Sequence, residues 1–152
     1  MEANKTQLYR VAKGIVFQDC DLEDAIQETI LKAWQGLSSL KRDELFKTWL
    51  IRILINECYT ILRQRNKTSL ELAQNQAGQF RETSTDQRID IWNALKRLDP
   101  DMRTVLILYY FEDISYKEIA RILEVQEGTV KSRLSRAKEK IGKILSEVEG
   151  GM

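Results

Sequence analysis

The stretch from Ser115 to Lys143 limits this chain to few folds, because it predicts two helices joined by a tight turn. Ser115 followed three residues later by Glu118 is a capping box, which predicts that a helix starts here. Apolar residues give this helix one buried side as far as Leu123, and residues 124–126 then break the pattern. The first helix of the pair is therefore predicted to be short.

The second helix of this stretch has two chemically different faces. At 3.6 residues per turn its apolar residues fall on one side and its polar and basic residues on the other. The apolar side consists of Val130, Leu134, Ala137, Ile141, Ile144 and Leu145, and the opposite side of Thr129, Ser132, Arg133, Arg136, Lys140 and Lys143. A short capped helix followed by such a stripe predicts a helix-turn-helix, whose second helix enters the DNA major groove. The alternative is a solvated cationic face on a surface helix.

The predicted DNA contacts follow from position along this second helix. Its first residues are expected to face base edges, and its later residues are expected to face phosphates. The predicted contact residues are Glu127, Gly128, Thr129, Lys131, Ser132, Arg133, Arg136 and Lys140. The whole chain has a net charge of only +1, so its positive charge is concentrated here, as a sequence-specific DNA reader requires.

Composition excludes several other functions. The chain has no histidine and no glycine-rich phosphate loop, so an enzyme is not expected, and neither is a cofactor or a bound metal ion. Cys20 and Cys58 are too far apart for a metal knuckle and are predicted to be small buried thiols. No apolar run approaches the roughly 20 residues of a membrane span, and no signal peptide opens the chain. A cytoplasmic protein, not a membrane protein, is expected.

The periodicity predicts an all-α chain of two small helical domains. Helices are expected over about residues 6–17, 22–34, 45–65, 86–98 and 100–112, before the helix-turn-helix. A polar linker at 68–85 divides the chain. Each domain has about 65 residues, a size at which one core is only marginally stabilising, so each half is expected to lean on a partner.

The helix at 22–34 has an unusual exposed face. Its predicted core side is Leu22, Ala25, Ile26, Ile30, Ala33 and Trp34, and the opposite face carries Asp24, Gln27, Glu28 and Leu31. An isolated exposed leucine carries no information. A leucine inside a polar rim also fits a protein-docking surface, so both interpretations stay open.

The helix at 45–65 carries a polar line between two apolar sides. This seam consists of Arg52, Asn56, Tyr59 and Arg63, loosely continued by Arg65 and Lys67. A cation, an amide and an aromatic ring in one line suit a nucleic-acid strand, since they can bind phosphate, a base edge and a base face. An exposed stripe on a mostly buried helix is the equal alternative.

Three segments, in this order and spacing, resemble the extracytoplasmic-function sigma factors, the smallest bacterial factors of the sigma-70 type. The segments are DLEDAIQETILKAW at 21–34, KTWLIRILIN at 47–56, and SYKEIA with EGTVKSRLSRAK at 115–120 and 127–138. The resemblance covers almost the whole chain. It implies a protein that binds core RNA polymerase, directs it to specific promoters and initiates transcription.

The resemblance also implies roles for the domains. Residues 1–67 would form a region 2-like domain for polymerase binding and for minus-ten recognition and melting. Residues 68–85 would be the linker, and 86–152 a region 4-like domain that reads the minus-thirty-five element. An anti-sigma factor, commonly membrane-anchored, is the further expected partner.

Single residues receive roles by the same resemblance. Asp24, Gln27, Glu28 and Leu31 would dock on the polymerase clamp, while Leu40, Arg52, Asn56, Tyr59 and Arg63 would contact the minus-ten element. Leu40 would lie nearest the pocket for a flipped base, whose lost stacking of a few kcal/mol the protein must offset. Promoter melting would then be captured by binding.

The chain departs from the family pattern at three positions. Leu40 stands where an aromatic residue is common, Thr60 where the family usually has Asp, and Glu124 where a turn glycine is usual. Two other functions compete with the sigma-factor interpretation: a dimeric helix-turn-helix regulator that binds a palindromic operator, and a sigma-like decoy that binds polymerase but not promoters.

Overall fold

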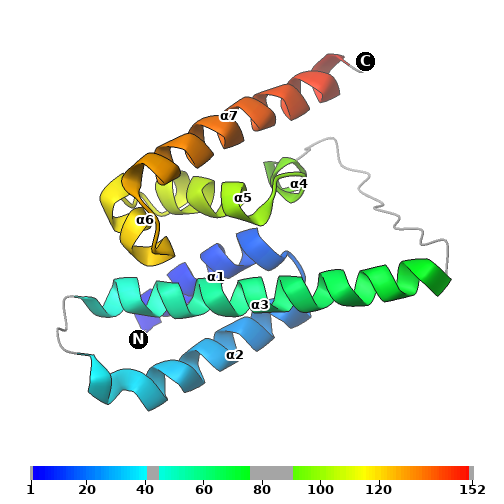
Figure 1. Cartoon of the computed structure of the whole chain (residues 1–152). Helices are drawn as coiled ribbons and strands as arrows, with labels where there is room; N and C mark the ends of the chain where they lie inside the picture. The colour runs from blue at the N-terminus through cyan, green and yellow to red at the C-terminus, as the bar shows by residue number, and fades with distance from the viewer. Residues whose placement is uncertain (1, 41–44, 76–90, 151–152) are drawn as a thin grey trace.

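The computed structural model describes residues 2–40, 45–75 and 91–150, and each regular element in these ranges is helical (Figure 1). The predicted all-α fold is therefore confirmed. The elements are α1 (Glu2–Val16), α2 (Asp19–Gly36), the 3-10 turn η1 (Leu37–Ser39), α3 (Phe46–Asn75), α4 (Ile91–Lys96), α5 (Pro100–Leu106), the π-helical turn η3 (Ile107–Phe111), α6 (Tyr116–Leu123) and α7 (Glu127–Gly150).

Helices α1, α2 and α3 pack together as the first half of the molecule. Their apolar residues recur three and four apart, so each helix turns one apolar side toward the other two. The side chains buried here include Leu8, Val11, Ile15, Leu22, Ala25, Ile26, Leu50, Leu54 and Ile55. Helix α2 begins at Asp19, three residues before its predicted start at residue 22, and Asp19 and Asp21 in its first turn suit the positive end of the helix dipole.

The predicted core side of α2 is wrong at two positions. The buried stripe runs through Leu22, Ile26, Thr29 and Ala33. Thr29 is fully buried. Its hydroxyl donates a hydrogen bond to the Ala25 carbonyl 2.6 Å away, so burial leaves this polar group satisfied. Ile30 and Trp34 lie beside this stripe, and 40% and 75% of their surfaces are exposed.

Helix α3 extends ten residues past its predicted end at Arg65 and ends at Asn75. The first part of the predicted linker is therefore helical, which fits the good helix formers Leu, Glu, Ala and Gln in its sequence. The rest of that linker, and the predicted helix start near residue 86, lie outside the described residues. The domain boundaries stay a prediction.

The second half consists of α4, α5, η3, α6 and α7. Pro100 occupies the first position of α5, where a missing amide hydrogen costs nothing, and Asp99 is its N-cap without a side-chain bond. The helix predicted to continue to residue 112 widens into η3, whose i to i+5 bond runs from the Glu112 amide to the Ile107 carbonyl. Asp113, with a φ of 57°, then turns the chain toward α6.

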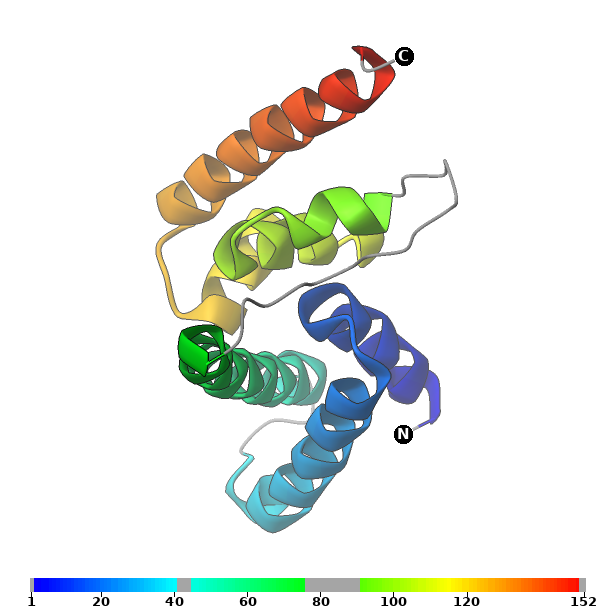
Figure 2. The same cartoon turned by 90° about the vertical axis from the view of Figure 1, so that its right-hand side faces the viewer.

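The two halves pack against each other. Figures 1 and 2 show α4 to α7 stacked on α1 to α3, and contacts join α3 to α6 and α1 to α5. Buried apolar residues of both halves belong to one continuous core. Each half therefore gains its additional burial from the other half of the same chain.

Candidate nucleic-acid interface

The helix-turn-helix forms as the sequence predicts. The Ser115 side chain accepts a hydrogen bond from the Glu118 amide at 3.2 Å, which caps α6. Glu124 ends α6 in the left-handed region, with φ 58° and ψ 45°. This conformation costs a residue with a Cβ about 1–2 kcal/mol, which explains why glycine is usual at such a turn.

The predicted DNA-reading face of α7 lies on the surface. Exposed members are Glu127, Gly128, Lys131, Ser132, Arg136 and Lys140, while Thr129 and Arg133 are partly buried. Arg133 is drawn toward the body of the protein by Asp101, whose carboxylate is 3.9 Å from the guanidinium. The apolar side is buried at Val130, Leu134 and Ala137 as predicted, but Leu145 is exposed.

The polar seam on α3 is not an open line. Asn56 and Arg63 are exposed. Arg52, by contrast, donates hydrogen bonds to the carbonyls of Arg121 and Ile122 in α6, and the Tyr59 hydroxyl donates one to Thr104 at 2.9 Å. Of these four residues, the structure therefore leaves Asn56 and Arg63 on the surface, with Arg63 donating a hydrogen bond to Thr60 of the same helix at 3.1 Å, and binds Arg52 and Tyr59 to the second half.

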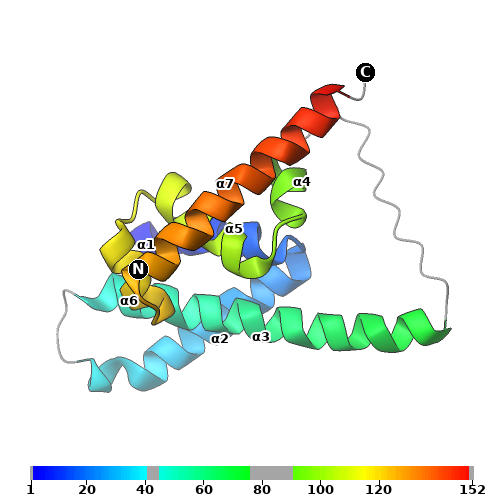
Figure 3. The same cartoon turned by 45° about the horizontal axis from the view of Figure 1, so that its top comes forward.

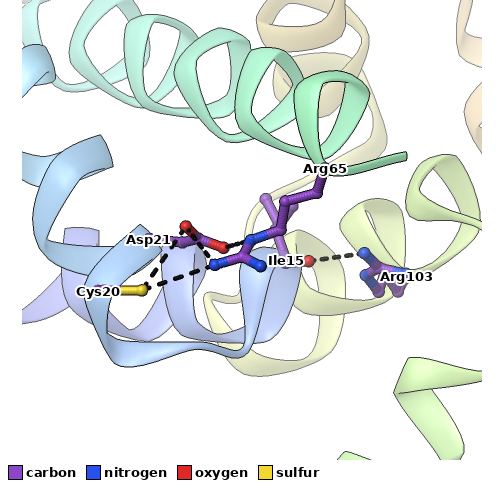
Figure 4. A network of polar contacts seen from close by, with 5 residues as sticks. All are labelled: Ile15, Cys20, Asp21, Arg65 and Arg103. Carbon is purple, nitrogen blue, oxygen red and sulfur yellow. Dashed lines mark hydrogen bonds and ion pairs between the residues drawn. The ribbon is translucent and has the colours of Figure 1, made fainter. Parts of the chain in front are cut away.

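Arg65 does not continue the seam. Its guanidinium binds Asp21 at the start of α2 and lies 3.6 Å from the Cys20 sulfur (Figure 4). The Asp21 hydrogen bond raises the pKa of Arg65 further. Cys20 is exposed, so the prediction of two buried thiols is wrong for this residue and confirmed for Cys58.

Burial controls the ionisation of two side chains on α3. It raises the pKa of the Tyr59 phenol from 10.0 to about 12, and the pKa of the Cys58 thiol from 9.0 to about 12. Both groups are therefore neutral at physiological pH. The Tyr59 hydroxyl remains a hydrogen-bond donor, and its ring packs against the apolar core.

A pocket of about 430 Å³ opens beside the start of α3. Its lining residues are Leu40, Leu45, Thr48, Trp49, Arg52 and Arg121. The volume and the aromatic wall suit a flat ligand such as a base. Leu40 was predicted to lie nearest such a pocket, and the structure places it in the wall.

The exposed face of α2 forms a second candidate surface. Asp24, Gln27 and Glu28 are exposed, and 49% of the Leu31 surface is open to solvent. Sequence reasoning missed that Ile30, Trp34 and Leu37 extend this apolar patch. The four-residue spacing of Ile30 and Trp34 was the available signal, but both residues were assigned to the core side of the helix. A rim of carboxylates around apolar anchors is typical of a docking site.

The described residues contain no candidate metal site and no candidate membrane span. Within residues 2–40, 45–75 and 91–150, no group of three or more Cys, Asp or Glu side chains could hold a metal ion. In the same ranges no helix is both long and apolar enough to cross a membrane.

Comparisons with known proteins identify the two halves. Residues 1–68 match the family model of sigma-70 region 2, and residues 88–141 match that of sigma-70 region 4. The chain is 31% identical over 147 residues to the ECF RNA polymerase sigma factor SigM of Mycobacterium tuberculosis, a match that covers 96% of this chain and 75% of SigM. The chain belongs to the extracytoplasmic-function (ECF) sigma factors. It is a transcription initiation factor and not an enzyme.

Two solved structures resemble this sigma factor over 95% of its length. One is the sigma factor RpoE in complex with the anti-sigma factor NepR from Bartonella quintana, with a TM-score of 0.77, 30% identity and 92% of that chain covered. The other is CnrH in complex with the cytosolic domain of CnrY, with a TM-score of 0.72, 26% identity and 84% covered. The predicted family and function are confirmed, in preference to an operator-binding regulator.

Proposed function

We propose that this sigma factor reads the minus-thirty-five element with the first turns of α7. The observation that carries the proposal is the open start of this helix. A Cβ built on Gly128 would meet nothing within 4 Å, so DNA can approach the backbone closely. Glu127 can accept a hydrogen bond from cytosine, and Arg136 and Lys140, further along the helix, can neutralise phosphates.

The minus-ten element is proposed to bind along α3. Asn56 and Arg63 are exposed and would contact a base edge and a phosphate. The pocket with Leu40 and Trp49 in its wall would receive a flipped base, and the indole would replace part of the stacking that the base loses. Arg52 and Tyr59 would join these contacts once the second half releases them.

Core RNA polymerase is proposed to dock on the outer face of α2. Leu31 and Trp34 are the largest apolar groups there, and their exposure in the free chain means that docking would desolvate them. Asp24, Gln27 and Glu28 would supply the polar rim. Carboxylates on this rim favour a basic partner surface, because opposite charges steer the encounter.

An anti-sigma factor is proposed to control this chain from the membrane, while the sigma factor itself works in the cytoplasm. Support comes from both structural neighbours: one is bound to an anti-sigma factor, and the other is bound to the cytosolic domain of its partner. The similarity covers both halves of this chain, so a partner could contact both. Polymerase and promoter DNA are cytoplasmic in bacteria, which places their initiation factor there.

Run-off transcription with core RNA polymerase on fragmented genomic DNA of the host tests this function. Discrete transcripts that share two upstream elements are expected, with none from core polymerase alone. Arg136→Glu should reduce them about tenfold or more, because it replaces a phosphate contact by repulsion. Lys5→Glu, the same charge change at an exposed site on α1, should leave transcription unchanged. Equal transcription by the Arg136 variant would contradict the assignment of α7.

A further inference from the structure

The interface between the halves contains two arginines that each cap a helix of the opposite half. Arg52 on α3 donates hydrogen bonds to the carbonyls of Arg121 and Ile122 at the end of α6. A helix leaves its last four carbonyls without intrahelical partners, so a guanidinium at this end satisfies them and complements the helix dipole. The end of α6 is therefore completed by a residue of the first half.

Arg103 on α5 makes the reciprocal contact. It is buried and donates a hydrogen bond to the carbonyl of Ile15, at the end of α1, at 2.6 Å (Figure 4). Its guanidinium also lies 5.1 Å from the centre of the Phe17 ring, in the turn after α1. Burial lowers the pKa of Arg103. The turn between α1 and α2 thus depends on a residue of the second half.

Further ion pairs and hydrogen bonds join the two halves. Arg10 on α1 binds both carboxylate oxygens of Glu112, at 2.9 and 3.0 Å, and the Glu112 side chain is 1% exposed. Thr48 donates a hydrogen bond to Glu118 at 3.0 Å. Such a bidentate pair with a desolvated carboxylate is stronger than an ordinary surface pair.

Glu124 adds a contact that a glycine could not make. Its carboxylate lies 3.5 Å from the Arg52 guanidinium, across the interface. The left-handed backbone at this turn favours glycine, so glutamate is retained here at a conformational cost. The ion pair with Arg52 is an evident function for this side chain.

These contacts use the residues that the promoter would need. Arg52 and Tyr59, half of the polar seam on α3, are bound to α6 and α5. Figure 3 shows α6 lying against the first turns of α3, beside the pocket that Arg121 helps to line. The second half thus occupies part of the surface assigned to the melted strand.

We propose that the free sigma factor is closed by its own interdomain contacts, with Arg52 and Glu124 as the latch, and that the halves must separate before α3 can bind single-stranded promoter DNA. The second half covers, and so masks, part of the seam on α3. The importance of this masking rests on the proposed minus-ten role of α3, whereas the closed state itself does not rest on that role. The occupant of the seam is the second half of the same chain, so closure needs no partner protein.

A variant of the second half can test this without touching any proposed DNA or polymerase contact. The opening variant, Glu112→Gln/Glu124→Gln, weakens both ion pairs across the interface. The control variant, Glu139→Gln/Glu147→Gln, removes the same charge from pairs with Lys143 and Arg97 inside the second half. Glu124→Gly is a further opening variant that keeps the turn, because glycine accepts the left-handed conformation. Circular dichroism should show that each variant is folded.

Two measurements on the polymerase-free protein decide the proposal. Spin labels at Glu23→Cys and Ser135→Cys, in a Cys20→Ser background, report the distance between the halves by pulsed electron resonance. The wild type and the control variant should give one narrow distribution of label-to-label distances. The opening variants should add a second, broader distribution at longer distances. A fluorescent single strand with the minus-ten sequence should bind the opening variant about tenfold more tightly, because more of the protein is binding-competent.

The closed state would be overturned by a broad distribution of spin-label distances in the wild type, or by a distribution that the opening variants leave unchanged. Opening without tighter binding of the single strand would overturn the masking of α3. The distance measurement contains neither polymerase nor DNA, so a failure of run-off transcription would overturn the proposed function and leave the closed state standing.

Discussion

Arginine serves two purposes in this protein at the scale of single residues. On α7, Arg136 is exposed and available to DNA, whereas Arg103 is buried and donates to the carbonyls of Ile15 and Leu98. The planar guanidinium can reach two acceptors at once, which an ammonium group on a flexible stem cannot do in the same geometry. The same residue type thus builds both the interface and the reading face.

Replacing Arg103 by lysine should therefore destabilise the protein. At least one buried carbonyl would lose its donor, so we expect Arg103→Lys to lower the free energy of unfolding by about 2 kcal/mol. Urea unfolding followed by circular dichroism measures this loss. Arg97→Lys, at a largely exposed side chain paired with Glu147 at 4.0 Å, should change stability by less than about 0.5 kcal/mol. Equal effects of the two changes would show that the Arg103 bonds contribute nothing.

The buried thiol predicts a pH dependence. Burial raises the pKa of Cys58 to about 12 from 9.0, so the folded protein holds this proton more tightly than the unfolded chain. Its stabilisation is complete below about pH 9 and is lost as the pH rises toward 12. The urea midpoint should fall between about pH 8 and about pH 11, and less steeply in Cys58→Ala.

At the scale of helices, periodicity predicted much of the fold, and its failures have identifiable causes. The capping box at Ser115 and the apolar side of α7, apart from Leu145, were correct because both depend on residues close in sequence. The predicted core side of α2 was wrong at Trp34. The neighbouring helices determine which flank of a helix is covered, and the helix's own sequence does not show this. The widening into η3 carried no sequence signal that separates it from an α-helix.

The α2 surface yields a prediction about assembly. Trp34 is 75% exposed, so Trp34→Ala should leave the free energy of unfolding within about 0.5 kcal/mol of the wild type. If α2 docks on polymerase, the same change should weaken core binding about tenfold or more, since a buried tryptophan anchor contributes strongly to an interface. Anisotropy of labelled sigma factor titrated with core polymerase measures the affinity. Tyr9→Ala, at another exposed aromatic residue, is the control and should bind normally.

At the scale of the whole molecule, the sequence did not predict the contacts between the two halves. Arg52 and Glu124 are 72 positions apart and their pairing is set by the fold. The seam on α3 could be recognised as polar, but not as covered, because its cover comes from the other end of the chain. The exposure of the polar side of α7 follows from the sequence of that helix alone, so it could be predicted without knowing how the halves pack.

The shared core predicts how the molecule unfolds. Because buried residues of both halves form one cluster, wild-type unfolding in urea should be a single transition, with coincident tryptophan fluorescence and circular dichroism. Glu112→Gln/Glu124→Gln weakens the interface without altering the core of either half, so the two probes should separate and the apparent m-value should fall. Glu139→Gln/Glu147→Gln should keep one transition. Coincident probes with an unchanged m-value in the opening variant would mean that apolar burial alone couples the halves, and that the ion pairs contribute little to closure.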